Sequence, residues 1–487
     1  MTPAATRDGS APGTIIVPVG VDGGVPPTVL RAVAGLGIDA DLEAWAPRLG
    51  LRRPGDTAVL PLGSGADVLL TAVGGADPAL EHDHVRQAAM AAARRLSPGG
   101  AAVNLTGTWS DEEGAYAAAA EGWTLGAYAY AAPSDGAVLL SRMAPGDVRH
   151  AGPEEVVREA VVAASATNLA RDLVNAPPGQ LVPERLASLC ADLGAALGFD
   201  VRVHRRPELE AGGFGGILGV GRGSENPPVL VELARGAGDS HVALVGKGIT
   251  FDAGGLSLKT SRGMLTMKAD MSGAAAVLGA FVALATLGSD VSVRGYLACA
   301  ENMPGPSATR IGDVLRHRGG RTVEVTDADC EGRLVVGDAL AYAVEHAPAA
   351  IVDLATLTSS SGLGPQLWAG FGNDRPLLDE VLSAGSASGE PGWPMPLWEP
   401  YRPGLRSDVA DARNFDPDAT QAFGGITAAL YLRPFVDDVP WAHVDLGLTV
   451  MRSAADDIWA GGAYGRGVRT LTRFLRERPR ARTGAAS

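Results

Sequence analysis

Short apolar runs alternate with amphipathic segments in the first third of the chain. The runs at 14–20 (TIIVPVG), 57–62 (TAVLPL) and 68–74 (VLLTAVG) have the length and composition of short buried strands. The segments at 84–96 and 112–130 have a helical pattern. This pattern predicts an α/β domain at the start of the chain.

The second part of the chain continues the alternation on a larger scale. A long apolar helix is expected over residues 270–288, between two strands. The expected strands lie at 241–251, 291–302, the start of 322–346, 349–361 and 439–447. Strands that alternate with helices favour a mostly parallel sheet, which binds ligands at the carboxyl ends of its strands.

A break rich in Pro, Gly and charge at 141–155 separates the two parts. At 487 residues the chain is too long for one ordinary core. We therefore predict an α/β protein of two domains. The smaller N-terminal α/β domain spans 1–155, with residues 1–13 as a loose tail. The larger C-terminal α/β domain spans 156–487 and has a mostly parallel, mixed central sheet.

The composition is that of a globular protein, with 46% hydrophobic and 20% charged residues. The formal net charge is −14, and residues 1–150 are also acidic, so electrostatics do not favour nucleic acid or an anionic membrane. The three cysteines, Cys190, Cys299 and Cys330, form neither a disulfide framework nor a zinc ribbon. The N-terminus lacks the pattern of a signal peptide, and the apolar stretch 273–288 is short for a bilayer span. We expect a soluble protein of a reducing compartment.

Two glycine-bounded stretches at predicted strand ends concentrate charged residues. They contain Lys247, Asp252, Lys259, Lys268 and Asp270 in 246–277, and Asp327, Asp329, Glu331 and Arg333 in 326–340. Only three of the 41 basic residues are lysines, and all three lie in the first stretch. Lysine can lose its proton when it is buried, whereas arginine effectively cannot, so these positions can require lysine specifically.

Three interpretations of these stretches stay open on residue chemistry alone. The first is a structural network of salt bridges. The second is a dinucleotide site, for which the glycine pattern at 219–224 and 246–255 is incomplete. The third is a pair of divalent cations, which would relieve the repulsion among crowded carboxylates and lower the pKa of a nearby lysine.

Longer motifs resemble the leucyl aminopeptidase (cytosol aminopeptidase) family, the M17 family of dinuclear metallopeptidases. The motif DADCEGRL at 327–334 matches the hallmark N-T-D-A-E-G-R-L without a gap. The resemblance is strong over about 160–475. Its other segments are VGKGITFDAGGLSLK, MKADMSGAAAV, NLARDLVNAPP, ENMPGPSATRIGDVL, DLATLT, SDVADARN, GGITAALYL and WAHVDLG.

The resemblance implies a role for each matching position. Lys247, Asp252, Asp270 and Glu331 would hold one metal ion, and Asp252, Asp329 and Glu331 would hold the other. The metals would be zinc or manganese, with magnesium or cobalt as alternatives. Lys259 would lie beside the scissile carbonyl, and Arg333 would hold a bicarbonate that shuttles a proton. Met267, Thr356, Ser359 and Gly447 would contact the substrate.

These roles imply a cytoplasmic aminopeptidase that hydrolyses the N-terminal bond of peptides through a metal-bridging hydroxide. The family also implies a homohexamer. Asp327, Cys330, Gly447 and Val450 depart from the residues that the family has or can have there, which leaves the preferred N-terminal residue open. We read Cys330 as a small buried side chain and His443 as a structural histidine.

Two further functions remain as alternatives. One is a homologue specialised for a narrow biosynthetic hydrolysis, which the altered pocket positions suggest. The other is a DNA-binding or architectural role, which the acidic first domain disfavours. Turnover across a panel of dipeptides distinguishes a specialised hydrolase from a general aminopeptidase. A salt-dependent gel shift with duplex DNA tests the DNA-binding role.

Overall fold

A computed structural model of the chain describes residues 14–20, 57–61, 67–73, 81–95, 102–104, 111–143, 150, 152–238, 240–358, 363–417, 424–452, 454–455 and 459–478. Its contacts divide the chain into two compact units. Unit 1 comprises 1–129, 143–168 and 453–462, and unit 2 comprises 130–142, 169–452 and 463–487. Helix α6 (Glu154–Asn175) contributes residues to both units. The domain boundary at 155/156 stays a prediction.

Unit 1 contains a four-stranded sheet in the order β2-β3-β1-β4. Its strands are β1 (Thr14–Gly20), β2 (Thr57–Pro61), β3 (Asp67–Val73) and β4 (Ala102–Asn104). Strand β1 is parallel to β3 and β4, whereas β2 is antiparallel to β3. Helices α3 (Glu81–Arg95) and α4 (Glu112–Gly126) pack together through small buried side chains such as Ala88 and Ala118. The strands and helices predicted here are confirmed, with shifts of a few residues at their ends.

Unit 2 is built on an eight-stranded mixed sheet in the order β13-β12-β15-β11-β7-β8-β6-β5. Its four central strands, β15, β11, β7 and β8, are parallel to their neighbours within that group, and the flanking pairs β12/β15, β6/β8 and β5/β6 are antiparallel. The strands are β5 (Asp200–His204), β6 (Val229–Arg235), β7 (Val242–Asp252), β8 (Val293–Asn302), β11 (Ala350–Ala355), β12 (Trp368–Gly372), β13 (Gly392–Pro394) and β15 (Trp441–Asp445). The predicted α/β class with a mixed central sheet is confirmed.

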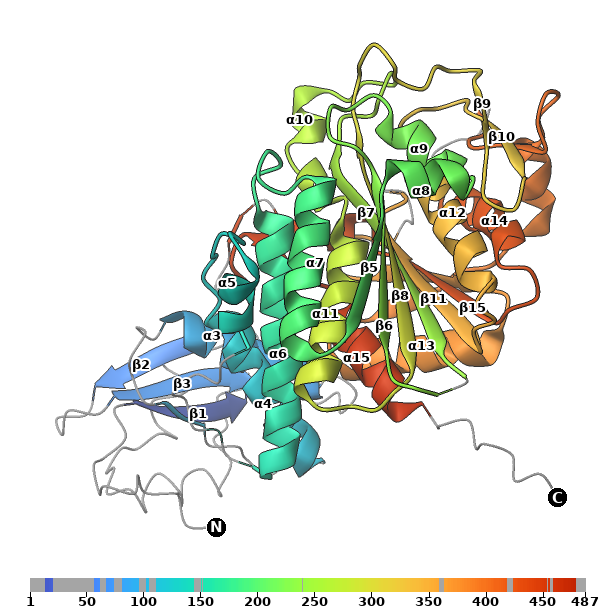
Figure 1. The fold of residues 1–487 in the computed structure, drawn as a ribbon. Coiled ribbons are helices and arrows are strands. Elements are labelled where there is room, and N and C mark those ends of the chain that lie inside the picture. Colours follow the sequence, from blue (N-terminus) through green and yellow to red (C-terminus); the bar gives the residue numbers. More distant parts are fainter. Residues whose placement is uncertain are drawn as a thin grey trace, which may run out of the picture. The chain divides into compact units, whose positions relative to one another are not determined.

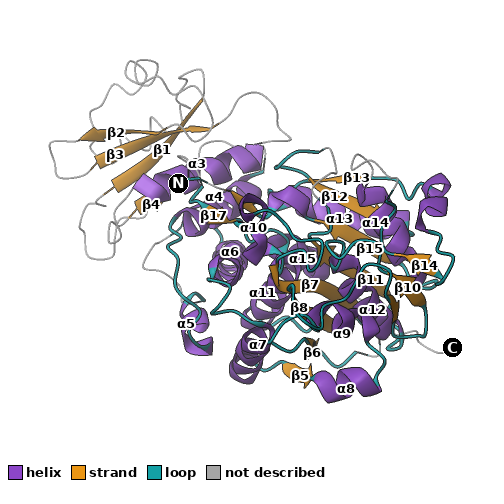
Figure 2. Ribbon diagram, turned by 90° about the horizontal axis from the view of Figure 1, so that it is seen from above, coloured by secondary structure: helices purple, strands orange, loops and turns teal. Residues whose placement is uncertain are grey.

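Helices cover both faces of this sheet, as Figures 1 and 2 show. One face carries α7 (Pro183–Leu197), α11 (Ser272–Thr286), α13 (Arg375–Ala387) and α15 (Val468–Glu477). The other face carries α9 (Gly215–Gly221), α12 (Gly332–Val344) and α14 (Gly424–Leu432). Because both faces are covered, the central strands are buried and mostly apolar; β11, for example, is buried at every residue, including Asp353.

Shorter elements complete unit 2. Helix α5 (Gly136–Ser141) packs on α7, and α8 (Arg206–Ala211) packs on α9. A second sheet has the order β14-β10-β9, with β9 at Val314–Arg316, β10 at Thr322–Glu324 and β14 at Ala412–Arg413. The turns α10 (Ser261–Met264) and η3 (Met267–Ala269) connect β7 to α11.

The apolar segment around α11 is a helix of the protein interior. Among the described residues, Ser261–Thr286 is the one helical stretch long and apolar enough to cross a membrane by length and composition. However, 89% of its apolar window is buried inside the structure. This agrees with the buried core helix predicted for 273–288.

The direction of the central strands brings four chain segments to one edge of the sheet. Strands β7, β8, β11 and β15 are parallel, so their carboxyl ends meet there. These ends are Asp252, Asn302, Ala355 and Asp445. In sheets of this kind, ligands bind outside the carboxyl ends of the strands.

Candidate active site

Asp252 is the last residue of β7, and the turn that follows it depends on glycine. Gly254 has φ +87, a backbone conformation that side chains disfavour. A Cβ at this position would lie 2.4 Å from the carbonyl oxygen of Ser257 and 3.0 Å from Oδ1 of Asp329. The bare turn therefore lets Asp329 approach the end of β7, and the chain then returns to present Lys259.

The second contributor is the start of α12. Glu331 is the N-cap residue of this helix, and Gly332 is its first residue. A Cβ on Gly332 would lie 2.5 Å from Nζ of Lys247, so a side chain there would require the lysine or the helix start to shift. Arg333 follows in the first turn and is 2% exposed.

Two lysines join the carboxylates from these segments. Nζ of Lys247 lies 2.8 Å from Oδ1 of Asp270 and 2.8 Å from Oε1 of Glu331, and it donates to the carbonyl oxygen of Thr356 at 2.9 Å. Nζ of Lys259 lies 2.9 Å from Oδ2 of Asp252.

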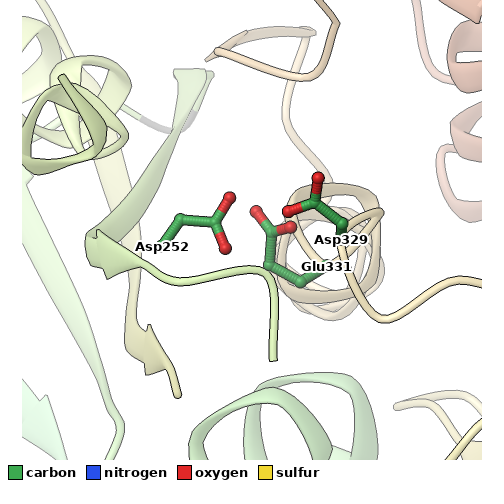
Figure 3. A group of neighbouring side chains, drawn as sticks. All are labelled: Asp252, Asp329 and Glu331. Carbon is green, nitrogen blue, oxygen red and sulfur yellow. The ribbon is translucent and has the colours of Figure 1, made fainter. Parts of the chain in front are cut away.

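Lys259 also forms an ion pair with Asp329. Three carboxylates, those of Asp252, Asp329 and Glu331, offer oxygens that lie within 4.8 Å of one another. Figure 3 shows these side chains pointing toward one another from the end of β7 and the start of α12. The structure therefore brings together all five predicted metal ligands and Lys259.

Crowding of acids in a buried place raises their pKa values. Burial is the main cause of a rise in the pKa of Asp329 to about 7, to which the charge of Asp252 adds while Lys259 opposes it. Burial also raises the pKa values of Asp270 and Glu331, although Lys247 opposes both shifts. Ionisation of these acids is therefore unfavourable in free energy, and a nearby cation would make it more favourable.

The two lysines respond in the opposite direction. Burial lowers the pKa of Lys247, but the charges of Asp270, Glu331 and Asp252 outweigh it, and the net pKa is raised. The pKa of Lys259 is also raised, because Asp252 and Asp329 outweigh its burial. In the protein without metal, both lysines are therefore ammonium ions that act as counter-charges.

The residues present fit divalent cations. Five carboxylates line the cavity with two lysines and one arginine, so acidic side chains outnumber basic ones. Oδ2 of Asp270 is buried and accepts no hydrogen bond from the described residues. Carboxylate oxygens are the ligands that hard and borderline dications take.

These groups lie in a cavity of about 320 Å³. Its wall adds apolar side chains, namely Met267, Leu357, Phe415, Leu448, Val450 and Met451. Of the predicted substrate positions, Met267, Thr356 and Gly447 line this cavity, and Ser359 lies outside the described residues. The cavity thus combines an acidic floor with apolar walls.

Arg333 and Cys330 also line the cavity. Nη1 of Arg333 donates to the carbonyl oxygen of Asn414 at 2.7 Å. Burial raises the pKa of the Cys330 thiol to about 12, against the opposing charge of Arg333. The thiol is therefore neutral, but Cys330 is only partly buried, so its interpretation as a small buried side chain is wrong in the burial.

The other charged positions singled out in the sequence have structural partners. Nζ of Lys268 donates to the carbonyl oxygen of Asn175 at 2.6 Å. His443 is fully buried, and its Nδ1 lies 2.6 Å from Oδ1 of Asp353. The structural interpretation of His443 is confirmed.

The sequence analysis missed one group of residues, which bind the cavity-lining residues by hydrogen bonds. The carboxylate of Asp445 accepts hydrogen bonds from the backbone N–H of Leu357 at 3.0 Å and of Gly447 at 3.2 Å. It also accepts a hydrogen bond from the hydroxyl of Thr358 at 2.7 Å. Asp445 belongs to the recognised segment WAHVDLG, but its partner Thr358 lies 87 residues away. Motif membership was the only signal available for it.

Comparison with known proteins agrees with this geometry. The catalytic domain of the cytosol aminopeptidase family matches residues 168–472. A "Probable cytosol aminopeptidase" of Streptomyces griseus subsp. griseus is 39% identical over 491 residues, which cover 95% of this chain and 92% of that protein. One of Roseiflexus castenholzii is 44% identical over 344 residues, which cover 69% of this chain and 70% of the relative.

Two solved structures are similar over nearly the whole chain. The bottromycin maturation enzyme BotP in complex with Mn has a TM-score of 0.83 and 37% identity, over 96% of this chain and 99% of that one. The cytosol aminopeptidase from Coxiella burnetii has a TM-score of 0.81 and 31% identity, over 96% of this chain and 98% of that one.

The fold and the acidic cavity are thus those of a metal-dependent aminopeptidase, a peptide hydrolase. The chain belongs to the cytosol aminopeptidase family.

Proposed function

We propose that this chain removes the N-terminal residue of peptides with two divalent cations bound in the cavity. The observation that carries the proposal is the convergence of four carboxylates and Lys247 at the carboxyl edge of the sheet. One cation would be held by Lys247, Asp252, Asp270 and Glu331, and the other by Asp252, Asp329 and Glu331. Zinc and manganese suit this ligand set, with magnesium and cobalt as alternatives.

When bound, two such cations supply an activated water and polarise the carbonyl of the scissile bond. Lys259 contributes a positive charge beside them. Its pKa is raised in spite of partial burial, because Asp252 and Asp329 lie next to it, so it stays protonated near neutral pH. A fixed ammonium ion at this place stabilises the negative charge that develops on the carbonyl oxygen.

Arg333 is proposed to hold a small planar anion, of which bicarbonate is the best candidate. In support, its guanidinium is buried, lines the cavity and is oriented by the carbonyl oxygen of Asn414. A guanidinium binds planar oxyanions through two parallel hydrogen bonds. Bicarbonate held there by Arg333 would supply a proton acceptor and donor beside the leaving amine. The test compares turnover with and without bicarbonate in the buffer. Removing bicarbonate should lower the turnover of the wild type and leave that of an Arg333→Ala variant unchanged.

The substrate side chain is proposed to lie against the apolar wall. Met267, Thr356, Ser359 and Gly447 are the proposed contacts, and the cavity also presents Leu448 and Val450. These side chains favour an apolar N-terminal residue.

A specialised biosynthetic hydrolysis is the second candidate. It is favoured by the 37% identity to the bottromycin maturation enzyme BotP over 96% of this chain. A general peptidase and a specialised enzyme can share the whole metal site, so the substrate profile separates them. Turnover of many unrelated dipeptides supports the general role, and turnover of very few supports the specialised one.

The decisive experiment measures metal content and turnover together. We expect chelator-treated protein to be inactive on aminoacyl amides and to regain activity with Mn²⁺ or Zn²⁺ at two ions per chain. Protein that takes up no metal and stays inactive after metal addition contradicts the proposal.

A location in the cytoplasm is supported by the relatives, which are named cytosol aminopeptidases. The homohexamer is proposed from the family resemblance. Light scattering should then give a mass about six times the 49.7 kDa of the chain. A monomer mass at micromolar concentration would contradict the hexamer.

A further inference from the structure

The segment 326–330, here called the ligand loop, is held by side chains from outside itself. It carries the predicted ligand Asp329 and leads directly into Glu331. The loop has no regular secondary structure, so its backbone N–H and C=O groups need other partners. Three side chains that are distant in the sequence supply most of them.

Asn414 holds the two ends of the ligand loop. Its side chain is fully buried. Its Oδ1 accepts from the backbone N–H of Thr326 at 2.8 Å and of Asp327 at 3.3 Å. Its Nδ2 donates to the carbonyl oxygens of Asp327 at 2.6 Å and Cys330 at 3.2 Å. Donors face the oxygen and acceptors face the nitrogen, so one orientation of this amide is determined.

The same residue also orients Arg333. The backbone carbonyl oxygen of Asn414 accepts from Nη1 of Arg333 at 2.7 Å. Asn414 therefore connects the ligand loop to the guanidinium that lines the cavity.

The middle of the ligand loop is held by two other side chains. Asn302, at the carboxyl end of β8, donates from Nδ2 to the carbonyl oxygen of Ala328 at 2.9 Å and to Oδ1 of Asp252 at 2.8 Å. Oγ of Ser257 accepts from the backbone N–H of Ala328 at 3.1 Å. A single amide thus spans the distance between the loop and a predicted ligand on a different strand.

We propose that Asn414 and Asn302 are positioning residues that hold Asp252 and the ligand loop in the geometry needed for metal binding. The inference rests on the proposed function, since it takes Asp252, Asp329 and Glu331 as metal ligands. Neither asparagine is among those ligands. Each acts by fixing the backbone or the carboxylate that carries the ligand oxygens.

A merely structural role would lower stability and leave metal affinity unchanged. The test therefore compares Asn414→Leu with a matched control, Asn373→Leu. Asn373 also joins two backbone groups through its amide, donating to the carbonyl oxygen of Val439 at 2.9 Å and accepting from the N–H of Trp441 at 2.7 Å. It does not line the cavity.

The experiment measures the Kd for Mn²⁺ of chelator-treated, full-length protein by equilibrium dialysis, and the Tm of the metal-free protein. Loss of a residue that orients metal ligands weakens metal binding by about 10- to 100-fold. We expect a rise in Kd of that size for Asn414→Leu. The Kd of Asn373→Leu should stay within about threefold of the wild-type value. Both variants are expected to lower the Tm, because each leaves buried backbone groups without partners.

Equal Kd values for the wild type and Asn414→Leu would overturn the positioning role of Asn414 while the proposed function stands. Wild-type protein that binds no Mn²⁺ would overturn the proposed function and the positioning roles with it. Asn302→Ala tests the second asparagine, and it decides if Asn414→Leu does not fold. This variant removes the donor to the carbonyl oxygen of Ala328 and to Oδ1 of Asp252, and it is expected to raise the Kd by about tenfold or more, whereas an unchanged Kd would overturn the positioning role of Asn302.

Discussion

Nζ of Lys247 lies 2.8 Å from Oε1 of Glu331, and both side chains are almost completely buried. This ion pair joins β7 to the start of α12, where Gly332 leaves no room for a larger group. Lys247 is an ammonium ion without metal, because its acidic neighbours raise its pKa. For Lys247 to bind a metal ion as a neutral amine, the cations have to displace that proton.

The first prediction compares Lys247→Arg with Lys259→Arg. Guanidinium keeps its proton and is larger, so Lys247→Arg should lose bound metal and about 100-fold or more in kcat/KM. Lys259→Arg should keep two metals per chain and lower kcat, because the longer side chain misplaces the charge. Metal stoichiometry and kinetics at matched pH check both. Two metals and near-normal turnover in Lys247→Arg would show that Lys247 is not a neutral ligand.

The second prediction concerns the close approach at Gly332. A Cβ there would lie 2.5 Å from Nζ of Lys247 and 2.8 Å from Cδ2 of Leu357. Gly332→Ala should therefore push the helix start or the lysine aside, which raises the Kd for Mn²⁺ by about tenfold or more. Gly179→Ala is the control, since a Cβ there meets no atom within 4 Å. Equal Mn²⁺ affinity in the two variants would contradict the prediction.

The third prediction is a pH dependence of the metal-free protein. The folded-state pKa of Asp329 is about 7, above its ordinary value of 3.8, so the folded protein holds a proton that the unfolded chain releases. Stability from this group is therefore greatest at low pH and falls as pH rises from about 4 to about 7. Asp329→Asn cannot titrate, so the Tm of the wild type relative to this variant should fall over that range and then level off.

Melting curves of both proteins in chelator at several pH values measure this difference. A Tm difference that does not change between pH 5 and pH 8 would show that Asp329 titrates normally. The same protonation predicts that Mn²⁺ affinity of the wild type rises with pH through about 7, because the bound proton competes with the metal.

The fourth prediction concerns Asp445. This buried carboxylate holds Leu357, Thr358 and Gly447, which line the cavity, but it is not a proposed metal ligand. Asp445→Ala should leave several buried donors unpaired and loosen this wall, lowering kcat/KM by about 10- to 100-fold with two metals retained. Thr358→Val removes one hydrogen bond and should have a smaller effect. Loss of metal in step with activity would instead place Asp445 in the support of the metal site.

The fifth prediction tests Cys330, which lies between two predicted ligands. Its thiol pKa of about 12 leaves almost no thiolate at pH 7, so alkylation by iodoacetamide should be slow. Cys330→Ala should keep kcat/KM within about threefold, since it replaces one small side chain by another. Rapid alkylation, or a large loss of activity in the alanine variant, would indicate a chemical role for the thiol.

The local pattern of residues was enough to predict the strands and helices that carry the site and the charged residues that they bring to it. Alternation of strands and helices is a local pattern, and it predicted β7, β8 and β15 within two residues of their bounds, whereas β11 ends at Ala355, before the predicted end at 361. The charged residues lie in two stretches, each next to a strand or helix end, so their identity and spacing could be read directly. The restriction of lysine to residues 247–268 also indicated a site that needs lysine.

How these parts meet depends on the fold as a whole. The order β13-β12-β15-β11-β7-β8-β6-β5 is far from the order along the chain, and it determines which strand ends are neighbours. Asn414 and Asp327, 87 residues apart, come into contact only through this folding, as do Lys247 and Glu331. Burial, and therefore the pKa of about 7 for Asp329, depends on the surroundings that all these segments create together. A local pattern contains the residues but not their neighbours, because contacts between distant segments depend on how the whole chain packs.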